Sequence, residues 1–126
     1  MRKTCLNKIF ELAKRDERVL FIGSDLGVGV LDDMCQQIPD RFFMEGVAEQ
    51  NMTMVAAGLA LEVKKVFTYS IGNFPTLRCL EQIRNDAAYH EVNLTIVASG
   101  GGFTYGALGM SHHATEDISI MRSIPN

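Results

Sequence analysis

The sequence has few of the features that mark membrane or nucleic-acid-binding proteins. Its longest apolar run, near residues 54–61, is much too short to cross a bilayer, so no membrane association is expected. Twelve basic and 15 acidic residues give a net charge of −3. No basic run interleaves with aromatic residues, which argues against a nucleic-acid surface.

Cysteine is scarce as well. Cys5, Cys35 and Cys79 are odd in number, widely spaced and outside any Cys-x-x-Cys motif, which predicts three reduced thiols in a cytoplasmic protein. The pair His112 and His113 could suggest a metal, but adjacent histidines point in different directions and no further ligand has suitable spacing. We therefore expect no metal ligands in this chain.

What is present is one domain's worth of sequence, 126 residues that are 47% hydrophobic. Short apolar runs that suit buried strands alternate with helical patterns. Alternation of this kind predicts an α/β fold, a mostly parallel sheet with helices on both faces. The loops that follow the strands should gather at one edge, where such sheets bind ligands. Strands are expected at 19–22, 66–70 and 92–98, and helices at 2–15, 30–38, 45–62, 75–89 and after residue 115.

The helix predicted over residues 45–62 carries the first candidate site residue. Glu49 leads into a stretch that is apolar on all sides after Met52. An acid near a helix start can simply stabilise the helix dipole, an interpretation that fits Glu45 well. A carboxyl in an apolar setting can instead hold a proton near neutrality and serve in catalysis. The residues alone leave both interpretations open and slightly favour the structural one.

Two further stretches could carry chemistry. Residues 99–113 (SGGGFTYGALGMSHH) follow a strand, but their glycine spacing matches no phosphate-binding fingerprint. This stretch is a flexible surface loop unless His112 donates a proton or a hydrogen bond to a substrate. Phe74 follows Gly72 at a strand-to-helix turn, where its ring could stack on a flat heterocycle, whereas Phe67 is expected in the core.

In chain order these stretches resemble the pyrimidine-binding domain of transketolases. The resemblance covers the chain from about Val19 onward. It is closest to separately encoded carboxyl-terminal transketolase subunits and more distant to deoxyxylulose phosphate synthase. It rests on residues 25–26 (DL), 46–52 (GVAEQNM), 56–60 (AAGLA), Phe74 with Arg78, 81–86 (EQIRND), 109–113 (GMSHH), 116–117 (ED) and 122–126 (RSIPN).

The resemblance implies a thiamine-diphosphate-binding fold and gives several residues a role. Glu49 matches the glutamate that hydrogen-bonds the aminopyrimidine ring of the cofactor and starts its activation. Phe74 matches the aromatic residue that stacks on this ring, and Tyr69 is expected at the cofactor site with it. Asp25 matches an aspartate near the thiazolium ring and the substrate, and His112 matches a histidine that contacts a substrate oxygen. Glu49 and His112 are the expected catalytic residues.

The resemblance also implies that the chain supplies half of an active site. The family holds the diphosphate and magnesium through a Gly-Asp-Gly segment in another domain, and this sequence contains none. We expect residues 1–126 to form a single pyrimidine-binding domain, without the diphosphate-binding and carboxyl-terminal domains. The magnesium ligands should lie on a partner domain or subunit, within a homo- or hetero-oligomer.

The implied reaction transfers a two-carbon ketol unit between sugars or sugar phosphates, but two positions depart from the family pattern. Leu108 stands where transketolases usually have an aspartate that reads a sugar hydroxyl. Residues 27–29 (GVG) stand where a serine often helps to hold a sugar phosphate. A less hydroxylated or differently shaped acceptor is therefore the hypothesis. The alternatives are a β-subunit-like part of a 2-oxoacid dehydrogenase and a non-catalytic relative that acts as a partner subunit.

Overall fold

A four-stranded parallel sheet forms the centre of the chain. The computed structural model describes residues 1–27 and 29–126. The strands are β1 (Val19–Gly23), β2 (Phe42–Met44), β3 (Lys65–Ile71) and β4 (Leu94–Ser99), in the spatial order β2-β1-β3-β4. Every neighbouring pair is parallel, with Phe21 opposite Phe42 and Phe67, and Thr68 opposite Ile96. The predicted α/β class and parallel sheet are confirmed.

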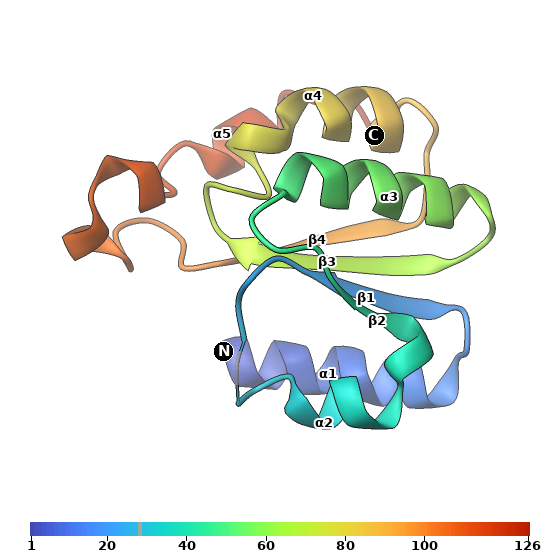
Figure 1. The fold of residues 1–126 in the computed structure, drawn as a ribbon. Coiled ribbons are helices and arrows are strands. Elements are labelled where there is room, and N and C mark those ends of the chain that lie inside the picture. The colour runs from blue at the N-terminus through green and yellow to red at the C-terminus, as the bar shows by residue number, and fades with distance from the viewer. Residues whose placement is uncertain (28) are drawn as a thin grey trace.

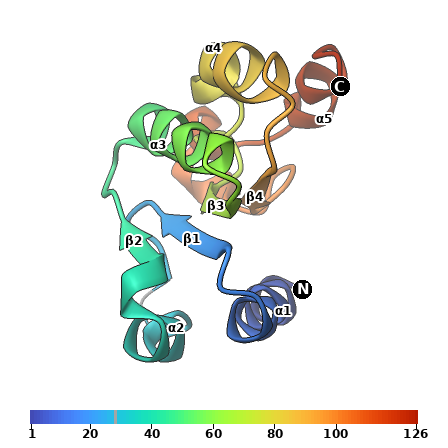
Figure 2. The same cartoon turned by 90° about the vertical axis from the view of Figure 1, so that its right-hand side faces the viewer.

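Helices cover both faces of this sheet, as predicted (Figure 1). One face carries α1 (Arg2–Arg15) and α2 (Asp32–Gln37). The other carries α3 (Glu49–Leu61), α4 (Leu80–Gln82) and α5 (Asp117–Met121). The view turned by 90° shows the same separation, with α1 and α2 on the opposite side of the strands from α3 and α4 (Figure 2). Within the described residues, no helix has both the length and the apolarity that crossing a membrane requires.

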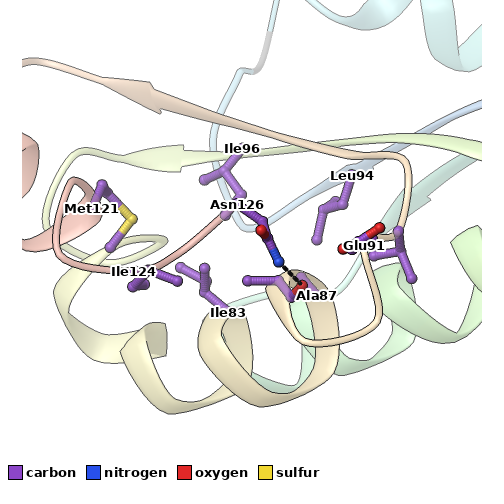
Figure 3. A pocket seen from close by; sticks show the side chains of 10 residues that line it. Ile83, Ala87, Glu91, Leu94, Ile96, Met121, Ile124 and Asn126 are labelled. Carbon is purple, nitrogen blue, oxygen red and sulfur yellow. Dashed lines mark hydrogen bonds between the residues drawn. The ribbon is translucent and has the colours of Figure 1, made fainter.

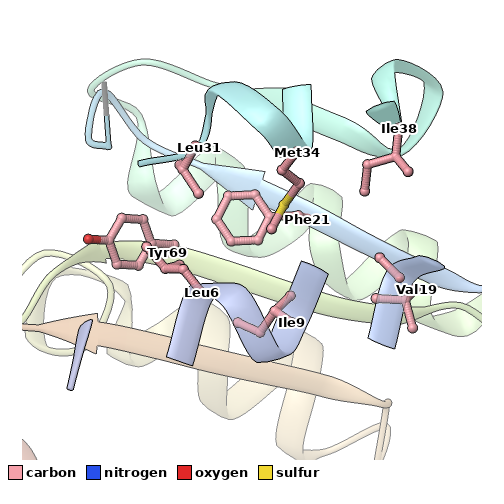
Figure 4. Packing of buried hydrophobic residues seen from close by; sticks show 9 residues of the cluster. Leu6, Ile9, Val19, Phe21, Leu31, Met34, Ile38 and Tyr69 are labelled. Atoms are coloured by element: carbon pink, nitrogen blue, oxygen red, sulfur yellow. The ribbon is translucent and has the colours of Figure 1, made fainter. Parts of the chain in front are cut away.

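The face under α1 and α2 is filled by large apolar side chains (Figure 4). Leu6 and Ile9 of α1 lie one turn apart and are buried, as the helical spacing of apolar residues predicts. They meet Phe21 of β1, whose ring stacks on Phe42 with centroids 5.5 Å apart. Tyr69 of β3 also points to this face. This aromatic cluster holds the edge pair β1–β2 to the rest of the sheet.

The face under α3 is packed with smaller side chains. Ala56 and Ala60 of α3 lie against Leu20 and Ile22 of β1. Since side chains alternate along a strand, Ile22 points to α3 while Phe21 points to α1. The small residues let the α3 backbone approach the sheet closely. This close approach determines where the first turn of α3 lies relative to the ends of the strands.

Several predicted boundaries differ from the structure. Strand β2 was not predicted, because it has only three residues and lies, half exposed, at the edge of the sheet. Helix α3 begins at Glu49 and not at residue 45, because residues 45–48 form the loop that leaves β2. The helix predicted over 75–89 is a 3₁₀ turn at Leu77–Cys79, then α4, then a π-helical segment at Ile83–Ala88. Residues 27–29 depart from the family pattern, and residue 28 of this stretch lies outside the described residues.

Candidate functional site

The carboxyl ends of the strands bring the candidate residues to one edge of the sheet, as the parallel topology predicts. Ser24 and Asp25 follow β1, and Gly72 follows β3. Glu49 is the first residue of α3, and its side chain is only 2% exposed. The loop before α3 is tied to the sheet by the Glu45 N–H, which donates to the Gly23 carbonyl at 2.9 Å. The first turn of α3 therefore lies beside the ends of β1 and β3.

Glu49 is held there by polar partners. The Ser70 hydroxyl donates to Glu49 Oε1 at 3.1 Å, and Arg78 Nη1 donates to Glu49 Oε2 at 2.7 Å. Ser24 in turn donates its hydroxyl to Ser70 Oγ at 2.8 Å. Ser24 and Ser70 are both 1% exposed. These four residues, here called the Glu49 cluster, form one buried hydrogen-bonded chain with a single half-exposed member, Arg78.

The setting of Glu49 is thus more polar than the sequence suggested. The apolar residues after Met52 face the sheet and the outside of α3, whereas the start of the helix faces Ser70. Ser70 reaches Glu49 because it shares the α3 side of β3 with Val66 and Thr68. An isolated buried carboxylate is costly, and both Glu49 oxygens here have a donor.

Phe74 lies beside the Glu49 cluster. In the tight turn after β3, the Phe74 N–H donates to the Ile71 carbonyl at 2.8 Å. Arg78 follows four residues later, in the 3₁₀ turn, and its guanidinium lies over the Phe74 ring, 4.4 Å from the centroid. The same guanidinium therefore contacts the Phe74 ring and the Glu49 carboxylate. A carboxyl group and an aromatic face are thus presented together to one planar, nitrogen-bearing group.

The glycine-rich loop brings His112 to Phe74. An isolated antiparallel bridge between Gly102 and Ala114 closes the loop, and the Asn73 amide donates to the Ser111 carbonyl at 2.8 Å. Gly72 is required here, because an added Cβ would lie 2.7 Å from the Ala114 Cβ. The His112 ring meets the Phe74 ring edge-on, with centroids 5.0 Å apart. The bridge, the hydrogen bond and the ring contact thus join the loop to the candidate site.

Two other predicted site residues lie elsewhere. Asp25 is exposed, directly after Ser24 on the same edge. Tyr69 is fully buried among Leu6 and Phe21, on the opposite face of the sheet from Glu49. Burial raises the pKa of the Tyr69 hydroxyl, an effect that the nearby Ser99 side chain opposes. The structure thus brings Glu49, Phe74 and His112 together, leaves Asp25 on their edge, and does not bring Tyr69 to them.

Cys79 supports the cluster through packing. It is fully buried, and its thiol donates to the Phe74 carbonyl at 3.2 Å. Burial raises the pKa of this thiol, so it stays protonated, as an inert packing residue does.

A groove of about 540 Å³ lies away from the Glu49 cluster (Figure 3). It runs between the π-helical segment, β4 and the last residues of the chain, where the Asn126 amide donates to the Ala88 carbonyl at 3.4 Å. Aliphatic side chains such as Ile83 and Ile96 line most of it. Convergent polar groups distinguish the Glu49 cluster, and this groove has few of them.

The sequence analysis missed Ser24, Ser70 and the contacts of Arg78. The place of Ser70 could have been inferred from the sequence. It lies two residues after Thr68, and so on the same face of the predicted strand, and it is the last residue of that strand, at the ligand-binding edge. The contact of Arg78 with Phe74 could also have been inferred, because residues four positions apart are neighbours at the start of a predicted helix. The hydrogen bond from Ser24 depends on how β1 and β3 pair, and the sequence alone does not show this.

The loops of this parallel α/β sheet thus gather an acid, an aromatic ring and a histidine at its carboxyl edge. The whole chain, residues 1–126, matches the model of the transketolase pyrimidine-binding domain. The chain belongs to this family.

Individual proteins to which the chain is similar are transketolase sections or subunits as well. The chain is 45% identical, over its whole length and 40% of the relative's, to a candidate transketolase C-terminal section of Methanocaldococcus jannaschii. It is 38% identical to an apulose-4-phosphate transketolase subunit of Phocaeicola vulgatus, over 98% of the chain and 40% of the relative. A solved split-gene transketolase, an inactive β4 tetramer, superposes with a TM-score of 0.84 at 35% identity, over 99% of this chain and 40% of that one. The chain thus spans about two fifths of the length of these relatives.

Proposed function

We propose that this chain is the pyrimidine-binding half of a thiamine-diphosphate-dependent, transketolase-like transferase that moves a two-carbon ketol unit between sugars. The observation that carries the proposal is that the buried Glu49 carboxyl and the Phe74 ring contact the same guanidinium at the carboxyl edge of the sheet. When bound, the cofactor supplies a carbanion equivalent and an electron sink for cleaving a bond beside a carbonyl. Family membership and the ordered motifs support this assignment.

The residues present fit the aminopyrimidine part of that cofactor. The Arg78 guanidinium shows that one planar group with N–H donors can contact Glu49 and Phe74 together. Glu49 would hold or give the proton at the ring nitrogen, and Ser70 would fix the direction of the carboxyl. Phe74 would bind one face of the ring through stacking. His112 would hydrogen-bond a substrate oxygen, and Asp25 would lie nearby on the same edge.

The other half of the site would come from a partner domain or subunit. The sequence holds no Gly-Asp-Gly segment, so we assign the diphosphate and magnesium ligands to that partner. The outer side of α3 and the loop before it expose Val47, Met54 and Leu61, at 68%, 46% and 56%. Apolar residues that gather on one surface mark a protein contact. We therefore propose a homo- or hetero-oligomer, and the three free thiols support a cytoplasmic location.

The acceptor is proposed to be less hydroxylated than, or shaped differently from, the usual pentose phosphates. Leu108 is 56% exposed in the loop that carries His112, so an apolar side chain stands where the family reads a hydroxyl. Relatives named for sugars other than xylulose and ribose phosphates support a different substrate, among them the 6-deoxy-6-sulfo-D-fructose transketolase subunit of Clostridium. Steady-state kinetics with several aldoses and ketoses test it. Ordinary efficiency with xylulose and ribose phosphates would contradict it.

The assignment of Glu49 is tested with the chain, its diphosphate-binding partner, cofactor and magnesium. Glu49→Ala should lower ketol transfer by about 10²–10⁴-fold, the usual contribution of an acid–base group. Glu62→Ala is the matched control, because Glu62 is an exposed acid at the far end of the same helix. Full activity in Glu49→Ala would refute the assignment. Glu49-dependent turnover of 2-oxoacids instead of sugars would favour the dehydrogenase-like alternative.

A further inference from the structure

Arg78 makes two contacts that draw it into the candidate site. Its Nη1 donates to Glu49 Oε2 at 2.7 Å, and its guanidinium carbon lies 4.4 Å from the centre of the Phe74 ring. Glu49 is 2% exposed, whereas the Arg78 side chain is 42% exposed. A half-exposed arginine thus covers the two groups that the proposed function assigns to the aminopyrimidine ring.

The guanidinium and an aminopyrimidine make the same kinds of contact. Both are planar and carry nitrogen, both can stack on an aromatic face, and both can hydrogen-bond a carboxyl group. Since one guanidinium already spans Glu49 Oε2 and one face of Phe74, a ring that contacts this oxygen and this face must take the same space. The two also make opposite demands on Oε2. Arginine donates to a carboxylate, whereas an unprotonated ring nitrogen needs a carboxyl that donates.

We propose that Arg78 is an internal competitor for the aminopyrimidine: it occupies the place of the ring while the domain is empty and withdraws when the ring binds. This inference rests on the proposed function and names a step that cofactor binding must include. Arg78 then keeps Glu49 paired until the ligand replaces it. The apparent affinity of the empty domain is reduced by the fraction of molecules in which Arg78 is in place.

The surrounding contacts allow this exchange. Glu49 Oε1 keeps its hydrogen bond from Ser70, and Ser70 keeps the one from Ser24, when Arg78 leaves. The buried Glu49 carboxyl therefore keeps a hydrogen-bond donor after Arg78 leaves. The guanidinium is partly solvated at the start, so its release costs less than the release of a buried charge. Phe74 stays in place through its backbone hydrogen bond to Ile71 and its contact with His112.

The test is a titration of the 126-residue chain with 4-amino-2-methylpyrimidine, followed by NMR. In the native chain, the Nε–H signal of Arg78 should move during the titration toward the position of an exposed arginine. Arg78→Met should bind the pyrimidine about tenfold tighter, since it removes a half-exposed ion pair and a cation–π contact that together amount to ~1.4 kcal/mol. Arg78→Lys, which keeps the charge but not the planar group, should lie between the two.

Arg84→Met is the matched control, because it removes the same charge from an exposed position in the π-helical segment and should leave affinity unchanged. Glu49→Ala separates the two proposals. If no variant shows pyrimidine binding that depends on Glu49, the proposed function fails. If binding depends on Glu49 but Arg78→Met binds equally or more weakly and the Arg78 signal stays fixed, the competitor role is overturned. The measurement on the native chain decides the matter even if a variant does not fold.

Discussion

The two faces of the sheet are built differently from the same strands. Under α1 and α2, Phe21 lies in a cluster of large buried apolar and aromatic side chains (Figure 4). Under α3, small apolar residues leave room for a line of buried polar groups that ends at Glu49. Because side chains alternate along β1 and β3, neighbouring residues such as Tyr69 and Ser70 serve opposite faces.

This difference separates stability from function within one domain. The aromatic face packs the strands against α1 and α2 and so helps to fix the positions of their carboxyl ends. The face under α3, here called the polar face, buries the polar side chains of Glu49, Ser70 and Ser24 in place of apolar ones. Hydrogen bonds among them offset the cost of that burial. Substitutions on the first face should therefore change the free energy of unfolding most, and those on the second should change ligand binding most.

The largest effect on stability is expected from Phe21→Ala. Phe21 is fully buried and stacks on Phe42, so its truncation opens a cavity between α1 and the sheet. The free energy of unfolding should fall by about 3–5 kcal/mol. Urea denaturation followed by circular dichroism measures this, and Phe103→Ala, at a 69% exposed phenylalanine, is the control and should stay within about 0.5 kcal/mol of the native chain. Equal losses in both variants would show that the aromatic face does not carry the stability.

A smaller effect is expected from Ser70→Ala on the polar face. This change removes the donor to Glu49 Oε1 and the acceptor of the Ser24 hydroxyl, both buried. The loss should be about 1–3 kcal/mol, together with weaker pyrimidine binding. Ser24→Ala is the informative partner, because it removes only the end of the chain and should cost about 1 kcal/mol or less. If Ser24→Ala costs as much as Ser70→Ala, the direct bond to Glu49 is not what matters.

Much of this architecture could be predicted from the sequence. The apolar runs at β1, β3 and β4 and the helical spacing of α1 have strong local periodicity, which predicts buried parallel strands and covering helices. Phe74 could be placed on the carboxyl edge because it lies in the loop after a predicted strand, whereas Glu49 could be placed only near the start of a helix. The edge strand β2 was missed because three half-exposed residues carry too little periodicity.

The interactions around Glu49 could be predicted less well. They join residues 21 to 46 positions apart, and they depend on the pairing of β1 with β3 and on the close approach of α3. The position of Tyr69 was also hard to predict. Its neighbour Ser70 lies at the site, but strand alternation turns the Tyr69 ring to the opposite face. Which face a strand residue meets is a tertiary property, and one step along the chain reverses it.

The smallest predicted effect lies at the amino-terminal edge of the sheet, opposite the candidate site. There the Arg18 side chain, the Arg18 N–H and Lys65 hold the pKa of Asp16 well below its usual value of 3.8. A carboxyl whose pKa is lowered by folding stabilises the fold above its unfolded pKa and loses that contribution as the pH falls below it. Asp16→Asn should therefore be slightly less stable than the native chain at neutral pH, and the difference should shrink as the pH falls below about 4. Urea midpoints at several pH values measure this, with Asp40→Asn, at an exposed acid, as the control.

Asp16 and its partners Arg18 and Lys65 are partly exposed, so added salt should reduce the stability difference as well. The buried Glu49–Ser70 hydrogen bond should respond little to salt. A difference that persists unchanged at low pH would show that Asp16 acts through its backbone geometry and not through its charge.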